Sequence, residues 1–171
     1  FAIQHGDQHL LLNGSASENS QYQLTVNLRG IEISYILDLV DFHAVEFSGL
    51  ATGKGFVSGV FGDVEASAKL QVEQFKFENG RMGTLNADVN WNTEKKQIDI
   101  HAIADDGPEA KTYIDGYVSP APGPGYIDLG IRADGTYLDF AHSFTSSFIS
   151  HIDGHGNGHA RVIGPLDAIN L

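Results

Sequence analysis

The stretch "VEASAKLQVEQFKFENGRMGTLNADVNW" (residues 64–91) decides the fold. Apolar and polar residues alternate on both sides of Asn79-Gly80, and successive side chains of an extended strand point to opposite faces. Asn-Gly is a strong hairpin signal, because both central residues of the preferred turn take positive φ. We therefore predict an antiparallel hairpin closed by Asn79-Gly80. The apolar phase slips before Phe75, which predicts a bulge near Gln74.

The predicted hairpin brings the apolar sides of its two strands next to each other. Their neighbours in sequence are mostly polar or charged, whereas the apolar sides carry no charge and several small residues. We predict a continuous apolar surface with room for acyl chains of a lipid. Its candidate residues are Val64, Ala66, Ala68, Leu70, Val72, Leu85, Ala87, Val89 and Trp91.

The same alternation recurs along most of the chain, and 20 glycines supply turns. This pattern is typical of antiparallel strands with one wet face, so we predict a mostly all-β protein. Two segments have helical spacing instead and predict short amphipathic helices that pack on the end of the sheet. Their apolar residues are Ile33, Ile36, Leu37 and Val40 in the first segment, and Phe140, Phe144 and Phe148 in the second.

Composition excludes several functions. The 22 acidic and 10 basic residues give a net charge of −12, which argues against a nucleic-acid binder and against docking on anionic headgroups. The chain has no cysteine, so thiol catalysis, disulfides and cysteine zinc sites are excluded. It begins with Phe1 and ends inside a predicted strand. We therefore expect residues 1–171 to be a single module excised from a longer protein.

The stretch "HIDGHGNGH" (residues 151–159) raises the question of a metal site. In an extended strand, His151, Asp153, His155 and His159 would share one face, and imidazole and carboxylate are ordinary zinc ligands. A metal-dependent hydrolase is therefore one alternative.

An internal repeat argues against that alternative. Residues 31–66 and 136–171 align with a shift of 105, and the alignment pairs Gly49 with Gly154. It also places Leu50 and Lys54 opposite His155 and His159, so the first copy keeps glycines and lacks the ligands. We predict no metal, no cofactor and no enzyme activity, with His155 and His159 as the ligand pair if the prediction is wrong.

Three stretches give the chain a resemblance to TamB-type proteins of the AsmA-like superfamily, in particular to the long periplasmic chains of Bacteroidetes-like bacteria. They are "GDQHLLLNGSASE" (6–18), "GVFGDVEASAKLQVEQFKFENGRMGTLNADVNWN" (59–92) and "IDGHGNGHARVIGPLDAINL" (152–171). The last contains the glycine-spaced apolar phrase ending in Gly-Pro-Leu that recurs in this family. The first repeat copy departs from it, with Val60-Phe61 in place of Pro-Leu.

The resemblance implies a fold and a function. The fold is a curved antiparallel sheet that forms an open trough, the β-taco, with an apolar inside. The parent protein would be anchored in the inner membrane and span the periplasm. It would serve outer-membrane biogenesis, with phospholipid acyl chains in the groove, a TamA- or BamA-type barrel as partner, or both. The family has no known active site to carry over.

A binding module of another class remains an alternative. Tyr113, Asp115, Tyr117 and Tyr126 lie in or beside one predicted strand. On a closed β-sandwich such residues would suit a carbohydrate, through ring stacking and hydrogen bonds to a carboxylate. Alternation alone does not choose between a closed sandwich and an open trough.

Overall fold

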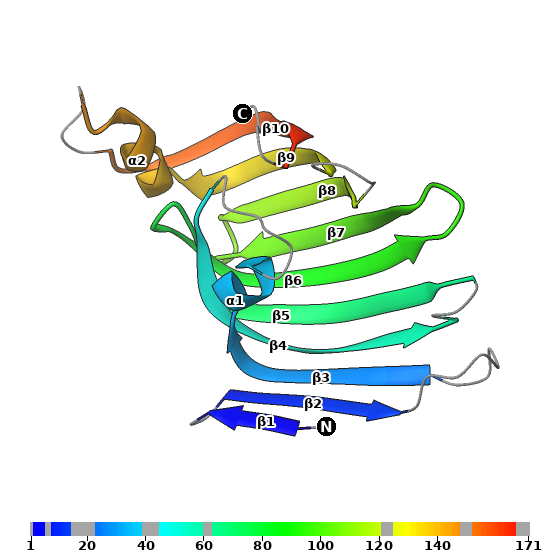
Figure 1. Cartoon of the computed structure of the whole chain (residues 1–171). Coiled ribbons are helices and arrows are strands. Elements are labelled where there is room, and N and C mark those ends of the chain that lie inside the picture. Colours follow the sequence, from blue (N-terminus) through cyan, green and yellow to red (C-terminus); the bar gives the residue numbers. More distant parts are fainter. Residues whose placement is uncertain are drawn as a thin grey trace.

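A computed structural model describes residues 2–5, 8–14, 23–38, 45–59, 63–120, 125–147 and 152–166. The described strands form one ten-stranded antiparallel sheet in which each strand pairs with its neighbours in sequence (Figure 1). The strands are β1 (Ala2–His5), β2 (Gln8–Gly14), β3 (Gln23–Glu32), β4 (Phe47–Ser58), β5 (Glu65–Phe77), β6 (Gly80–Asn92), β7 (Gln97–Asp105), β8 (Lys111–Ser119), β9 (Tyr126–Tyr137) and β10 (His155–Pro165). The helices are α1 (Ile33–Asp38), the 3-10 turn η1 (Asp139–Ala141) and α2 (His142–Thr145).

The predicted fold class is confirmed. The sheet is antiparallel throughout and strongly curved, and α1 lies in its hollow (Figure 1). Among the described residues β1 pairs only with β2 and β10 only with β9, so the sheet stays open as a trough. The described part of the chain has no helix with the length and hydropathy needed to cross a membrane.

The two faces of the sheet differ in chemistry. Residues paired directly across antiparallel strands share a face, so the register gives rows that run across the sheet. We call the face that α1 packs against the apolar face. One of its rows runs through Leu10, Leu28, Gly53, Leu70, Ala87, Ala102, Ile114, Ile131 and Ala160. A row on the opposite, polar face runs through Asn27, Lys54, Lys69, Asp88, His101 and Asp115.

Irregularities in several strands gather at the sheet end that carries α1 and α2. The register shifts in β3, β4, β5, β6, β9 and β10 near this end, and we call this series of irregularities the bulge line. Gly83 and Gly135 take φ of 80° and 65° there, a region in which side chains with a Cβ are strained. Bulges bend strands and increase their twist. The strands therefore bend at this line, and Phe47, Phe75 and Phe77 near it pack in or against the core of the apolar face.

The core lies beside the bulge line. Ala51, Val72 and Leu85 lie in one row and are 0%, 1% and 7% exposed. Ile33 and Ile36 of α1 pack against this cluster.

A second cluster, on β9 and β10, joins the two sides of the trough. Leu37 at the end of α1 and Val45 before β4 pack with Ile127 and Val162. Phe47 belongs to both clusters, and its ring lies 5.8 Å from that of Phe75. The helix and the start of β4 thus link strands that are distant in the sheet order.

The predicted bulge at Gln74 is confirmed, whereas the predicted turn was wrong by one residue. The register of β5 shifts between Val72 and Phe75, and Gln74 has φ of 52°. The turn consists of Glu78 and Asn79, with φ of 48° and 63°, and Gly80 is the first residue of β6.

The physical reason for this register is the packing of η1. The ring of Phe140 lies 5.6 Å from that of Phe77, the residue that pairs with Gly80. A Cβ on Gly80 would lie 2.3 to 2.5 Å from atoms of Phe140. Gly80 is therefore required for the close approach of η1, and Glu78-Asn79 supplies the turn.

Both predicted helices are present in shorter form, and Val40 and Phe148 lie outside the described residues. The repeat remains a prediction, and the order of elements in its two copies is the same. A strand ends at Glu32 in one and at Tyr137 in the other, and a helical segment and a further strand follow in each case.

We predict that Gly80→Ala destabilises the fold by about 1–3 kcal/mol, the usual cost of overpacking. Gly158→Ala is the matched control, because a Cβ there meets no atom within 4 Å of the described structure. The control should stay within about 0.5 kcal/mol of the wild type. Urea unfolding measures both variants, and equal stability of the two would contradict the packing of η1 on Gly80.

Candidate functional site

The apolar face is the candidate site. Its predicted residues do lie together, because Ala68 pairs with Val89, Leu70 with Ala87 and Val72 with Leu85. Ala66 pairs with Val57 of β4 and Trp91 with Ile98 of β7, which extends the same face on both sides. Val64 precedes β5, and its carbonyl oxygen accepts a hydrogen bond of 2.7 Å from the hydroxyl of Thr93.

The apolar face extends far beyond the predicted hairpin. A second row crosses nine strands and consists only of aliphatic residues and glycine. It runs through Leu12, Val26, Gly55, Ala68, Val89, Ile100, Gly116, Leu129 and Val162. Reasoning from residues 64–91 alone missed this extent. The alternation in the other strands was the available signal, but the rows needed the strand order.

Burial of the apolar face varies along the strands. Beside the bulge line it is buried under α1 and Phe47, whereas Ala68, Val89 and Trp91 farther along the strands are only half-buried. Apolar surface left in contact with water costs about 25 cal/mol per Å². The half-buried part is therefore the region where an apolar ligand gains most from binding.

Three side chains on the apolar face carry polar atoms: Thr112, Thr136 and Trp91. The hydroxyls of Thr112 and Thr136 lie 2.6 Å apart and satisfy each other. The indole nitrogen of Trp91 is buried and has no hydrogen-bond partner among the described residues. Such an unpaired donor costs free energy. These residues lie outside the two listed rows, whose members contribute no hydrogen-bonding side chain.

The polar face carries the residues of the carbohydrate alternative. The guanidinium of Arg132 lies 4.1 Å from the ring centre of Tyr113 and covers one face of that ring. Asp115 is hydrogen-bonded to His101, and Tyr126 is 38% exposed. A ring that is already stacked on a guanidinium offers one face less to a sugar. The described residues also form one sheet, without the second layer of a sandwich.

His155 and His159 lie on either side of a register shift in β10. The ring of His155 packs against that of Tyr137 in a tilted arrangement with ring centres 4.1 Å apart, and its Nδ1 lies 2.6 Å from the carbonyl oxygen of Gly135. His159 pairs with Arg132 four residues further along β10, beyond a register shift at Gly156/Gly158. Among the described residues no three metal-binding side chains come together. His151 lies outside the described residues.

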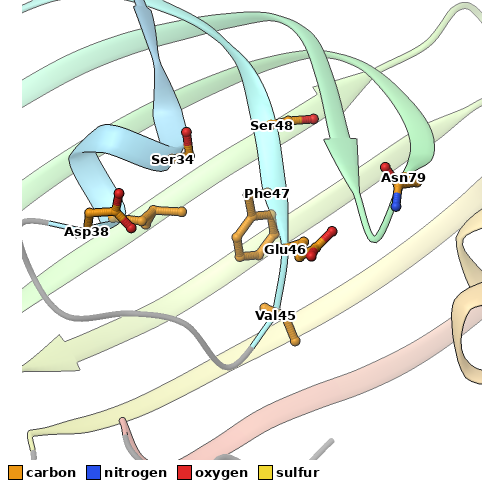
Figure 2. Close-up of a pocket in the computed structure, with 8 residues that line it drawn as sticks. Ser34, Asp38, Val45, Glu46, Phe47, Ser48 and Asn79 are labelled. Atoms are coloured by element: carbon orange, nitrogen blue, oxygen red, sulfur yellow. The ribbon is translucent and has the colours of Figure 1, made fainter.

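A cavity of ≈390 Å³ lies between α1, the start of β4 and the β5–β6 turn (Figure 2). Its apolar lining consists of Leu37, Val45 and Phe47, which also belong to the hydrophobic cluster that reaches β9 and β10. Its polar lining consists of Ser34, Asp38, Glu46, Ser48 and Asn79. Sequence reasoning missed this cavity, because its walls come from three separate elements.

No family model, curated protein or solved structure matches this chain.

Two carboxylates on the polar face have pKa values that are lowered by the groups bonded to them. Hydrogen bonds from Arg161, with N–O distances of 2.7 Å, lower the pKa of Asp128. A hydrogen bond from the backbone N–H of Gly107 has the largest effect in lowering the pKa of Asp105, and Lys111 lowers it further. Both carboxylates are therefore held in the charged form when the chain is folded.

We predict that acid destabilises the protein partly through these groups. A folded pKa below the unfolded value of about 3.9 gives stability that is present above that value and lost as pH falls through the folded pKa. Urea midpoints should drop between about pH 5 and about pH 2.5. The drop should be smaller in Asp128→Asn. An unchanged drop in this variant would contradict the contribution of Asp128.

We also predict that metal-free protein binds no zinc tightly at residues 151–159, because no three metal-binding side chains come together among the described residues and the first repeat copy lacks the ligands. Calorimetric titration with zinc tests this. Tight one-to-one binding that disappears in His155→Ala with His159→Ala would overturn it.

Proposed function

We propose that this chain is a non-enzymatic segment of a periplasm-spanning protein and holds phospholipid acyl chains on its apolar face. The observation that supports this most is the continuity of that face, whose two listed rows cross nine strands and consist only of aliphatic residues and glycine. A ligand that covers such rows must itself be apolar along its length, since a polar group there would lose its hydrogen bonds to water.

The energetics suit a ligand that moves. Each buried methylene of an acyl chain is worth about 0.8 kcal/mol, so many methylenes along the trough together offset the freedom that the lipid loses on binding. The rows contain no polar side chain that would fix a hydrocarbon at one position. Many weak contacts together hold the acyl chain, and none of them fixes its position along the strands. This suits a lipid that moves along the trough.

Localisation and partners follow from the TamB-type resemblance and belong to the same proposal. The parent chain would be anchored in the inner membrane, and a TamA- or BamA-type barrel would receive its far end. Assistance in the assembly of outer-membrane β-barrel proteins is the second role within this family. An open sheet with an apolar inside suits an unfolded strand less well than an acyl chain, because backbone amides on the apolar face would lack partners.

The experiment uses a photo-crosslinking amino acid placed on either face. Leu70 and Val89 lie on the apolar face, and Lys69 and Asp88 are their neighbours in sequence on the polar face. We expect phospholipid adducts in cells from the first two positions and none from the last two. Lys69 and Asp88 form an exposed ion pair of 2.9 Å. Their replacement should cost little stability.

The outcomes separate the candidate functions. Equal lipid labelling on both faces, or none on either in a folded protein, would overturn the proposal. Protein adducts in place of lipid at Leu70 and Val89 would favour the role in barrel assembly. Loss of oligosaccharide binding on replacement of Tyr117 or Tyr126 would favour the carbohydrate alternative.

A further inference from the structure

The dipeptide Asn-Gly occurs at three places in the chain: Asn13-Gly14, Asn79-Gly80 and Asn157-Gly158. An asparagine before glycine is prone to lose its side-chain amide, because the glycine nitrogen approaches the side-chain carbonyl carbon without hindrance from a side chain of its own. The dipeptide is the same at all three places, so a large difference in reactivity between them must come from the surroundings that the fold gives each one.

Two of the three dipeptides are held in place by the sheet. Asn13 and Gly14 both pair with residues of β3. Asn79 lies in the β5–β6 turn, and a Cβ on Gly80 would lie 2.3 to 2.5 Å from atoms of Phe140. Attack on the asparagine side chain requires the glycine nitrogen to swing toward it, and these contacts oppose that movement.

The third dipeptide lies at an irregularity of the edge strand β10. The register with β9 shifts between Gly156 and Gly158, so Asn157 has no paired residue opposite it in the described part of β9. Asn157 and Gly158 are both exposed, and a Cβ on Gly158 would meet no atom within 4 Å of the described structure. The backbone here is therefore held less tightly than at the other two dipeptides.

A hydrogen bond also activates the side chain of Asn157. Its carbonyl oxygen Oδ1 accepts from the backbone N–H of Gly135 at 2.6 Å. The bond draws electron density from the carbonyl carbon and stabilises the negative charge that develops on the oxygen during attack, as backbone donors do in an oxyanion hole. The carbonyl oxygen of Gly135 lies 2.6 Å from Nδ1 of His155, which keeps the donor in position.

We propose that Asn157 is a site of spontaneous deamidation, and that the fold directs this reaction to Asn157 and away from Asn13 and Asn79. The backbone nitrogen of Gly158 forms a bond to the side-chain carbonyl carbon of Asn157. The bond from that carbon to Nδ2 breaks, and ammonia leaves with the proton of the Gly158 N–H. The cyclic succinimide then takes up one water molecule, and no oxidant or reductant takes part.

The two products of this water addition differ in their effect on the sheet edge. Opening of the ring at the side-chain carbonyl gives aspartate, which keeps an oxygen within reach of the Gly135 N–H. Opening at the backbone carbonyl gives isoaspartate, in which the main chain is longer by a methylene group where the register already shifts. Hydrogen exchange at the Gly135 amide should then be faster in the isoaspartate form, and unchanged exchange would contradict this effect.

The test follows all three asparagines in one sample. The intact protein is kept in mildly alkaline buffer, where the glycine N–H gives up its proton more readily, and its peptides are analysed by mass spectrometry. In the folded protein we expect Asn157 to react about tenfold or more faster than Asn13 and Asn79. In urea, where the fold is lost, the three rates should agree within about threefold.

Gly158→Ala is the matched variant, because its side chain hinders the attacking nitrogen while the open space around Gly158 lets the fold accept it. Reaction at Asn157 should become slower in this variant, and reaction at Asn79 should stay the same. Similar rates at Asn157 and Asn79 in the folded wild type would overturn the inference. A rate at Asn157 that rises about tenfold in urea would overturn it as well, because the fold would then protect this site too.

Discussion

The structure depends on one constraint: an apolar face that crosses nine strands must be covered, and the described residues contain no second sheet to cover it. The bulge line meets part of this requirement, because the strands bend there and Phe75 and Phe77 near it pack in or against the core. Beside it, Val72 is 1% exposed. Away from the line, Val89 on β6 is only half-buried, whereas Ile127 and Val162 on β9 and β10 are buried. The bulge line therefore covers the first cluster, and Leu37 with Phe47 covers the cluster on β9 and β10.

The two helical segments complete the cover by joining elements that the sheet order keeps apart. α1 follows β3 but carries Leu37 to the cluster on β9 and β10. η1 follows β9 but reaches the β5–β6 turn, where the carboxylate of Asp139 accepts from the backbone N–H of Arg81. The hydroxyl of Ser143 donates to the carbonyl of Glu78 at the same place. These long-range contacts hold the curvature, since a curved single sheet gains little from packing within itself.

Local sequence information was sufficient for the parts of the fold that depend on local geometry. Alternation gave the two faces, and the phase slip before Phe75 gave the bulge at Gln74, because side-chain direction follows from backbone period alone. The turn at Glu78-Asn79 was missed by one residue, because its register is decided by Phe140, which is sixty residues later in the chain. Extension of the apolar face over nine strands, and the cavity beside α1, required the order and register of all strands.

The chemistry of the apolar face also limits where selectivity can arise. A surface of aliphatic residues and glycine binds one acyl chain about as well as another, because the hydrophobic effect is proportional to area and has no direction. Under the proposed function, discrimination between lipids would then require polar groups at fixed positions outside the two listed rows, because a polar group within the rows would interrupt the apolar path of the tails.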